Sequence, residues 1–321
     1  MKRYEKMKYR RCGASGVLFP AISLGLWHNF GTDAPYSNCR DMILGSFDLG
    51  ITHFDLANNY GPIPGSAEET FGRILNSELK SHRDELFIAT KAGYGMWDGP
   101  YGEWGSKKHM LSSLDQSLKR MDLEHVDLFY HHRPDPDTPL DETIDALVQV
   151  MRSGKALYVG ISNYDPVQTK EMIEACERRG VKLLIHQVNY SMFQLPSEDI
   201  ISVLDKSNIG TIAYCPLAQG LLTDKYLDGI PEISRAATKN THLNRDSITE
   251  EKIVKANALN EIAKQRGQTL AQMALAWVLQ RTTTALIGAS KLSQIEENVK
   301  IVDRLAFTEQ ELNEINKVIR E

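Results

Sequence analysis

Eight short apolar runs alternate with helix-like segments along nearly the whole chain, and this alternation limits the possible folds more than any other feature. The runs show little alternation between polar and apolar residues, which is typical of parallel strands buried on both faces. In chain order they are AISLGLW (21–27), ITHFDLA (51–57), LFIATKAG (86–93), VDLFYHH (126–132), ALYVGIS (156–162), LLIHQVN (183–189), TIAYCPL (211–217) and ALIGAS (285–290). The chain therefore predicts a repeated β-α unit.

The segments between the runs carry the signals of amphipathic helices. Apolar residues recur at a spacing of three to four, as at Leu111, Leu114, Leu118 and Met121, which gives each helix one apolar stripe. The predicted helix ends are capping boxes at Ser66 with Glu69 and at Thr138 with Asp141, a helix start at Asp165-Pro166, and C-terminal caps at Gly154 and Gly180.

Eight β-α units predict a closed parallel (β/α)8 barrel of the TIM type, because eight is the strand number that closes such a barrel. The competing fold is an open, doubly wound sheet, which carries a G-x-G-x-x-G turn after its first strand when it binds a dinucleotide. The chain contains no such motif. Barrels of ~250 residues fold as one unit, so residues 1–321 are expected to form a single domain.

One connection is far longer than the others. More than sixty residues separate the seventh run from the eighth, beginning with the polar segment TDKYLDGIPEISRAATKNTHLNR (223–245) and continuing as two predicted helices over about 249–281. Long loops in compact domains are usually functional lids or disordered linkers. Because this one follows the seventh strand, we expect it to lie over the C-terminal mouth of the barrel as a lid.

Composition excludes several classes of function. A net charge of −5 and a pI near 6.0 give no reason to expect nucleic acid as a partner. No run approaches the ~18 apolar residues of a membrane helix, so no membrane partner is expected. The four cysteines lack metal-ligand or C-x-x-C spacing, which predicts no metal site and a reduced, cytoplasmic protein. The basic start MKRYEKMKYRR (1–11) is interpreted as a solvated surface segment.

Polar residues gather at the ends of the predicted strands, which is where the chemistry of such barrels lies. In strand order they are Trp27, Asp55 with Tyr60, Lys91, His132, Ser162 with Asn163, Gln187, Tyr214, and Gly288 to Ser290. This arrangement predicts that they meet at one mouth.

Asp55, Tyr60, Lys91 and His132 together predict proton delivery to a carbonyl oxygen. A lysine ammonium lowers the pKa of a neighbouring tyrosine, and Asp55 is the natural partner for a buried Lys91. His132 would direct a ring N–H at the substrate oxygen. Side chains cannot supply a hydride, so the other half of the reaction requires a nicotinamide cofactor. Taken singly, the same residues also fit a structural ion pair and ordinary packing, and only their joint occurrence favours catalysis.

These segments resemble the aldo-keto reductase family over nearly the entire chain. FDLANNYG is similar to the family's tyrosine segment, SAEETFGRIL to the helix that follows it, ATKAG to its lysine strand and LFYHHRPD to its histidine strand. VGISNY, HQVNY and IAYCPLAQGLL are similar to its cofactor-binding strand ends. Within the family, the resemblance lies near the potassium-channel beta-subunit branch.

The resemblance implies specific roles. Tyr60 is the general acid, Lys91 with Asp55 lowers its pKa, and His132 orients the carbonyl. Implied cofactor contacts are Trp27, Asp55, Ser162, Asn163, Gln187, Tyr214, the segment Cys215, Pro216, Leu217, Ala218, Gln219 and Gly220, then Lys225, Arg235, Gly288, Ser290, Gln294, Glu297 and Asn298. Implied substrate contacts are Trp27, Tyr60, Trp97 and His132, with the loop YGMWDGPYGEWG (94–105) as a wall.

The expected cofactor is NADPH. Many family members carry Lys and Arg where this chain has Gly288 and Gln294, so NADH stays open as the alternative, and for NADPH the resemblance implies Lys291 or Arg235 as the substitute contact to the 2′-phosphate. The expected activity is reduction of small aldehydes such as glyceraldehyde 3-phosphate or methylglyoxal. Arg133, Lys107 and Lys108 are open to two interpretations, a phosphate contact or plain surface charge.

An alternative function remains open at this stage. In it, the chain is a nucleotide-sensing beta-type subunit of a membrane protein, with weak reductase activity. The complete catalytic set favours the reductase. The resemblance also implies a homo-oligomer, a tetramer or an octamer.

Overall fold

In a computed structural model, residues 3–231 and 247–320 are described. Eight parallel strands close into a barrel in the order β10-β3-β4-β5-β6-β7-β8-β9, which confirms the predicted (β/α)8 fold. The strands are β3 (Ile22–Gly25), β4 (His53–Asp55), β5 (Phe87–Ala92), β6 (Val126–His131), β7 (Ala156–Ser162), β8 (Ile185–Asn189), β9 (Gly210–Tyr214) and β10 (Thr284–Ile287).

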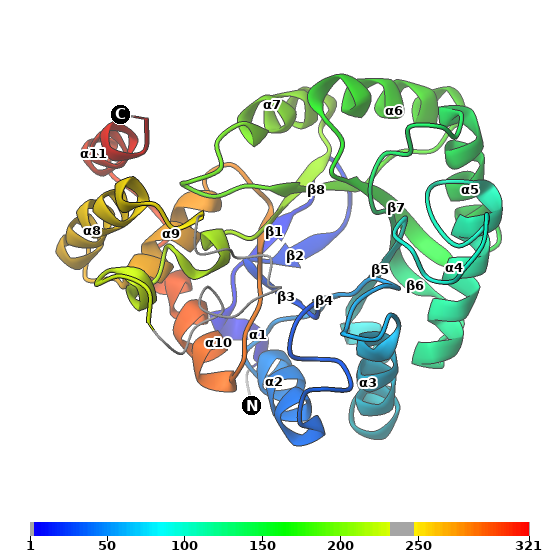
Figure 1. The fold of residues 1–321 in the computed structure, drawn as a ribbon, viewed down its shortest axis with the longest axis horizontal. Coiled ribbons are helices and arrows are strands. Elements are labelled where there is room, and N and C mark those ends of the chain that lie inside the picture. Colours follow the sequence, from blue (N-terminus) through cyan, green and yellow to red (C-terminus); the bar gives the residue numbers. More distant parts are fainter. Residues whose placement is uncertain (1–2, 232–246, 321) are drawn as a thin grey trace.

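Helices surround the barrel in a ring, as Figure 1 shows. The described helices of eight or more residues are α2 (Tyr36–Asp48), α3 (Ser66–Ile74), α4 (Lys107–Met121), α5 (Leu140–Arg152), α6 (Pro166–Arg178), α7 (Ser197–Ser207), α8 (Glu250–Gln265), α9 (Leu270–Val278), α10 (Leu292–Val299) and α11 (Glu309–Arg320). The two helices predicted after the long loop are α8 and α9, while α8 and α11 lie side by side at the outer edge.

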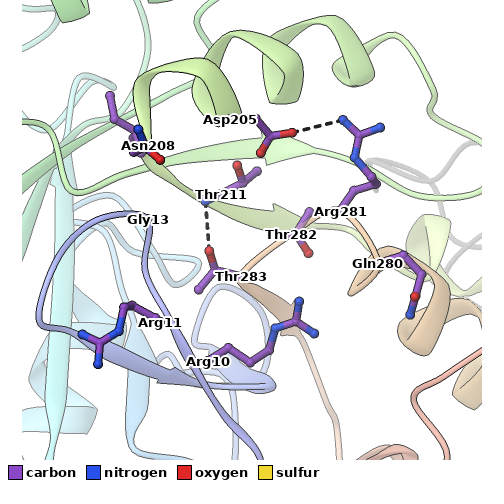
Figure 2. Close-up of a pocket in the computed structure, with 11 residues that line it drawn as sticks. Arg10, Arg11, Gly13, Asp205, Asn208, Thr211, Gln280, Arg281, Thr282 and Thr283 are labelled. Carbon is purple, nitrogen blue, oxygen red and sulfur yellow. Dashed lines mark hydrogen bonds and ion pairs between the residues drawn. The ribbon is translucent and has the colours of Figure 1, made fainter.

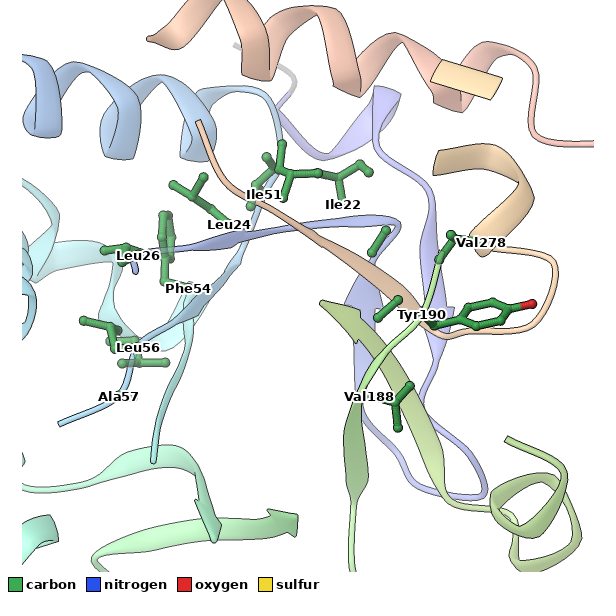
Figure 3. Packing of buried hydrophobic residues seen from close by; sticks show 14 of the residues in the cluster. Ile22, Leu24, Leu26, Ile51, Phe54, Leu56, Ala57, Val188, Tyr190 and Val278 are labelled. Atoms are coloured by element: carbon green, nitrogen blue, oxygen red, sulfur yellow. The ribbon is translucent and has the colours of Figure 1, made fainter. Parts of the chain in front are cut away.

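Two apolar cores hold these layers together. The larger one lies between the strands and the helices, and Figure 3 shows part of it, including Leu24 of β3 beside its register partner Phe54 of β4. The smaller core is formed by residues of several barrel strands, among them Ala89, Leu128 and Ile212. Burial on both faces explains why the strand sequences are nearly continuous apolar runs.

A short hairpin precedes the barrel, and sequence analysis missed it. Its strands are β1 (Tyr9–Arg11) and β2 (Leu18–Pro20), which pair antiparallel. Phe19 of β2 is fully buried in the smaller core, with its ring 4.7 Å from that of His53 and 4.8 Å from that of Phe87. The interpretation of the basic start as a solvated segment is therefore wrong for Tyr9 and Arg10, which pack as part of this hairpin.

A pocket of about 270 Å³ lies beside the hairpin, at the N-terminal ends of β9 and β10 (Figure 2). Arg10 donates to the Leu279 carbonyl at 2.8 Å, just beyond the C-terminus of α9. Arg281 pairs with Asp205 at 3.3 Å, and the Thr211 amide donates to the Thr283 hydroxyl at 3.3 Å. Because active sites of these barrels lie at the opposite, C-terminal end, this pocket is not the predicted site.

The helix ends show which of the predicted capping motifs form in the structure. Asp165 caps α6 through a complete capping box with Gln168, and Gly154 and Gly180 adopt positive φ just beyond α5 and α6, as predicted. The capping boxes predicted at Ser66 and Thr138 are wrong. Ser66 is already the first residue of α3, and Pro139 occupies the N-cap position of α5, so neither hydroxyl can cap its helix.

Candidate active site

The ends of β4, β5 and β6 bring the predicted catalytic residues together. Lys91 on β5 is fully buried and uses all three of its hydrogen-bond donors: to Asp55 Oδ2 at 2.5 Å, to the Leu56 carbonyl at 2.7 Å and to the Tyr60 hydroxyl at 3.2 Å. Tyr60 reaches this position from the turn after β4, where Gly61 has φ of 95°. A side chain at Gly61 would collide with the Ser66 hydroxyl, so this turn requires glycine.

Asp55 and Lys91 form a buried ion pair. Burial raises the pKa of Asp55 and lowers the pKa of Lys91, whereas the mutual attraction opposes both shifts. Gln187 Nε2 donates to the other carboxylate oxygen of Asp55 at 3.2 Å. Each charge is thus held by hydrogen bonds as well as by its partner, which is what a buried pair requires to persist.

Tyr60 ionises less readily in this structure than an ordinary tyrosine does. Its pKa lies well above the ordinary value of 10, because burial outweighs the neighbouring ammonium and the nearby Asp55 carboxylate adds to the shift. The prediction that Lys91 lowers the pKa of Tyr60 stays a prediction, because the ammonium would act against the effect of burial. Tyr60 is held as a neutral hydroxyl, a proton donor, while Lys91 orients its oxygen.

His132 lies beside Tyr60, with the two rings nearly perpendicular and their centroids 5.9 Å apart. Burial lowers the pKa of His132 well below 6.5, with Lys91 adding to the shift, so the imidazole is neutral near pH 7. The adjacent His131 contacts Tyr164 instead, at 2.5 Å between Nδ1 and the hydroxyl. Of the two adjacent histidines, His132 therefore faces the site.

A hydrogen-bonded cradle adjoins these residues. Asn163 accepts from the Tyr214 hydroxyl at 2.7 Å and donates to the His132 carbonyl at 2.9 Å. The Ser162 hydroxyl donates to the Gln187 carbonyl at 3.0 Å. Together with the partly exposed ring of Tyr214, these side chains offer amide and hydroxyl groups beside a flat aromatic face, which fits a nicotinamide carboxamide and ring.

The segment after β9 has an unusual backbone. Cys215, Ala218 and Gln219 all adopt positive φ, between 47° and 59°, and Gly220 follows at 104°. Non-glycine residues in this region store strain, which concentrates at ligand-binding sites. Pro216 and Leu217 lie in the same turn, while Lys225 is exposed in the short helix Asp224–Tyr226. Arg235 and part of the predicted lid fall outside the described residues.

The predicted adenosine contacts lie around the start of α10. Gly288 faces open space, and the Ser290 amide donates to Gln294 at 2.8 Å. Glu297 accepts from Gln272 Nε2 at 2.7 Å and pairs with Lys300, and Asn298 is buried. The structure therefore brings Gly288, Ser290 and Gln294 to one strand end, whereas Glu297 also has a structural role in joining α10 to α9.

The substrate side contains Trp27 and one residue of the predicted wall loop. Trp27 lies with its ring 6.2 Å from that of Tyr60. Trp97 packs 5.0 Å from His109, and no contact with the four central residues is recorded for it among the described residues. Tyr94, the first residue of the predicted wall loop, was given no role of its own in the sequence analysis, and its ring lies 4.7 Å from that of His132. Its place three residues after Lys91, in an aromatic-rich loop, was the available signal.

Two kinds of feature are absent from the described part of the chain. No group of three or more His, Cys, Asp or Glu residues there is arranged to hold a metal ion. None of its helices is both long enough and apolar enough to span a membrane.

Comparison with known proteins agrees with this geometry. Residues 21–320 match the model of the aldo/keto reductase family. The chain belongs to the aldo/keto reductase family, and is an oxidoreductase that uses a nicotinamide cofactor.

Among individual relatives, the chain is 52% identical to L-glyceraldehyde 3-phosphate reductase of Escherichia coli (strain K12), over 99% of this chain and 94% of that protein. It is 34% identical to a probable voltage-gated potassium channel subunit beta of Arabidopsis thaliana, over 98% of this chain and 97% of that protein. The potassium-channel beta-subunit branch suggested by the sequence resemblance is thus represented among the relatives.

Proposed function

We propose that the protein reduces small aldehydes, such as glyceraldehyde 3-phosphate or methylglyoxal, to alcohols with NADPH. The observation that carries this proposal is the buried Asp55–Lys91 pair hydrogen-bonded to Tyr60 beside a neutral His132. The relatives named L-glyceraldehyde 3-phosphate reductase support an aldehyde as the substrate.

The proposed mechanism divides the work among these residues. Bound NADPH supplies the hydride. Tyr60 donates its hydroxyl proton to the carbonyl oxygen as negative charge develops there, because its high pKa keeps it protonated until that moment. Lys91 holds the tyrosine oxygen in place and stabilises the phenolate that remains. His132 orients the carbonyl as a neutral hydrogen-bond donor.

The cradle residues position the cofactor in this proposal. Ser162, Asn163 and Gln187 hold the carboxamide, and Tyr214 stacks on the nicotinamide ring. The backbone of residues 215–220, with Lys225, would hold the pyrophosphate, and residues 288–298 would hold the adenosine. Lys291, exposed at the N-cap of α10, is the proposed contact for the 2′-phosphate that distinguishes NADPH from NADH.

The assembly and location are also proposals. The family resemblance supports a homo-oligomer, a tetramer or an octamer. The described cysteines form no disulfide, which supports a reducing, cytoplasmic environment. Sedimentation of the purified protein tests the proposed homo-oligomer.

The decisive experiment follows NADPH consumption with glyceraldehyde 3-phosphate and methylglyoxal, using wild type, Tyr60→Phe and Tyr158→Phe. Removing the proton donor should lower kcat by about 10²-fold or more. Tyr158 on β7 stacks on Phe87 away from the mouth, so its variant should match wild type. Full activity in Tyr60→Phe would contradict the mechanism. Tight NADPH binding without turnover of any aldehyde would favour the cofactor-sensing subunit instead.

A further inference from the structure

Tyr94 occupies a place in the mouth that the proposed mechanism does not use. It lies two residues beyond the end of β5, and its ring meets His132 nearly edge-on, at an interplanar angle of 84°. His132 in turn stands beside Tyr60. His132 therefore contacts the rings of both Tyr60 and Tyr94.

Arg133 holds the Tyr94 ring in position. Its guanidinium carbon lies 4.1 Å from the centre of the Tyr94 ring and 3.7 Å from that of the Trp104 ring. Arg133 also donates to the Gly93 carbonyl at 3.0 Å and pairs with Glu103. With its charge paired and two aromatic rings packed against its guanidinium, Arg133 is suited to hold the loop in place rather than to bind a substrate phosphate.

The Tyr94 hydroxyl has no assigned hydrogen-bond partner among the described residues, and its side chain is half-buried. Its phenol group is close enough to raise the pKa of both Tyr60 and Tyr214, and its ring contacts His132, so it lies at the same mouth as these residues. A rigidly held donor with no partner of its own is suited to recognise a polar group on a ligand.

We propose that the Tyr94 hydroxyl donates a hydrogen bond to an oxygen on the carbon next to the aldehyde carbon, so that the site selects 2-hydroxyaldehydes and 2-oxoaldehydes over simple aldehydes. This inference rests on the proposed function, because it assigns the carbonyl oxygen itself to Tyr60 and His132. The neighbouring oxygen of the substrate then points past His132 toward Tyr94. Trp27 and the remainder of the mouth contribute apolar contact that all small aldehydes share.

The test compares two aldehydes that differ only at this oxygen, glycolaldehyde and acetaldehyde, with wild type, Tyr94→Phe and Tyr158→Phe. The phenylalanine keeps the ring between His132 and Arg133 and removes only the hydroxyl. For Tyr94→Phe, kcat/KM for glycolaldehyde should fall about tenfold, the effect of one neutral hydrogen bond, with little change for acetaldehyde. The loss should lie mainly in KM, because the contact exists before the hydride moves. Tyr158→Phe should preserve the preference of wild type.

Three results would overturn the inference. If kcat/KM of wild type were no higher for glycolaldehyde than for acetaldehyde, no group of the protein would recognise this oxygen. An equal fall in kcat/KM for both aldehydes in Tyr94→Phe would mean that Tyr94 contributes only packing. No change in kcat/KM for either aldehyde would mean that the Tyr94 hydroxyl does not contact the substrate. These results leave the proposed function intact. Failure of wild type to reduce any aldehyde would reject the proposed function and this inference with it.

Discussion

The Asp55–Lys91–Tyr60 cluster shows how burial and charge compete at single side chains. An ammonium 3.2 Å from a phenol oxygen favours the phenolate, but removal of the phenol from water favours its neutral form. In this structure burial prevails, and the pKa of Tyr60 rises well above 10. Lys91 is itself neutralised in part by Asp55 at 2.5 Å, which weakens its pull on the tyrosine.

The pH dependence of aldehyde reduction tests this balance. Tyr60 must be protonated to act as the acid, and with a pKa well above 10 it remains so through pH 9. His132 must be neutral, and its lowered pKa keeps it so above pH 6.5. We therefore expect kcat/KM to be nearly constant from pH 6.5 to 9. A fall in kcat/KM that follows a single ionisation inside this interval, and that is absent from the residual activity of Tyr60→Phe, would contradict this expectation. It would mean that the Lys91 ammonium lowers the pKa of Tyr60 into the interval.

Individual helices and strands depend on context to different degrees. Asp165 caps α6 because its side chain reaches the Gln168 amide at 2.8 Å within the same turn. Ser66 has the residue type of a cap, but its hydroxyl is buried without a hydrogen-bond partner because α3 begins at Ser66 itself. Sequence analysis missed the hairpin β1–β2 because its residues are buried by contact with barrel residues such as His53 and Phe87, and not because of an apolar pattern within the hairpin.

Two alanine variants separate these cases. Asp165→Ala should lower the free energy of unfolding by about 1 kcal/mol through loss of the N-cap. Ser66→Ala should cost much less, because no cap bond is lost, although the sequence motif alone predicts equal effects. Urea denaturation of the two variants measures the difference. Comparable losses would mean that Ser66 caps α3 in solution.

The barrel as a whole buries several histidines in neutral form. His53, His131 and His186 are fully buried, and burial lowers the pKa of each to about 3. They belong to three strands around the barrel, β4, β6 and β8, so protonation of any of them would disturb the core that all helices share. Acid sensitivity is therefore expected to be a property of the entire fold.

The stability of the protein should fall as the pH drops below 6.5. The unfolded chain binds protons at these histidines near pH 6.5, whereas the folded state binds them only near pH 3, so acid favours unfolding throughout this interval. Each histidine contributes up to about 1.4 kcal/mol per pH unit. Urea denaturation between pH 8 and 5 measures the slope, which His186→Gln should reduce by one histidine's share. An unchanged slope would place the acid sensitivity elsewhere.

The barrel and the positions of its central residues could be predicted from the amino-acid sequence. Eight apolar runs with helical stripes between them leave few other folds, and a barrel brings strand ends together, so Asp55, Lys91 and His132 could be placed at one mouth from their strand positions alone. Capping at Asp165 was also predictable, because it depends only on contacts within one turn of the helix.

Properties that depend on residues distant in the sequence could be known only from the folded structure. The burial that sets the pKa of Tyr60 comes from the closed barrel, not from the motif around it. Tyr94 enters the site because Arg133, forty residues after Gly93 in sequence, holds the loop against His132. Phe19 is part of the core because the hairpin packs it against residues of the barrel strands. Such effects arise from which surfaces meet in space, and no local pattern of residues records that.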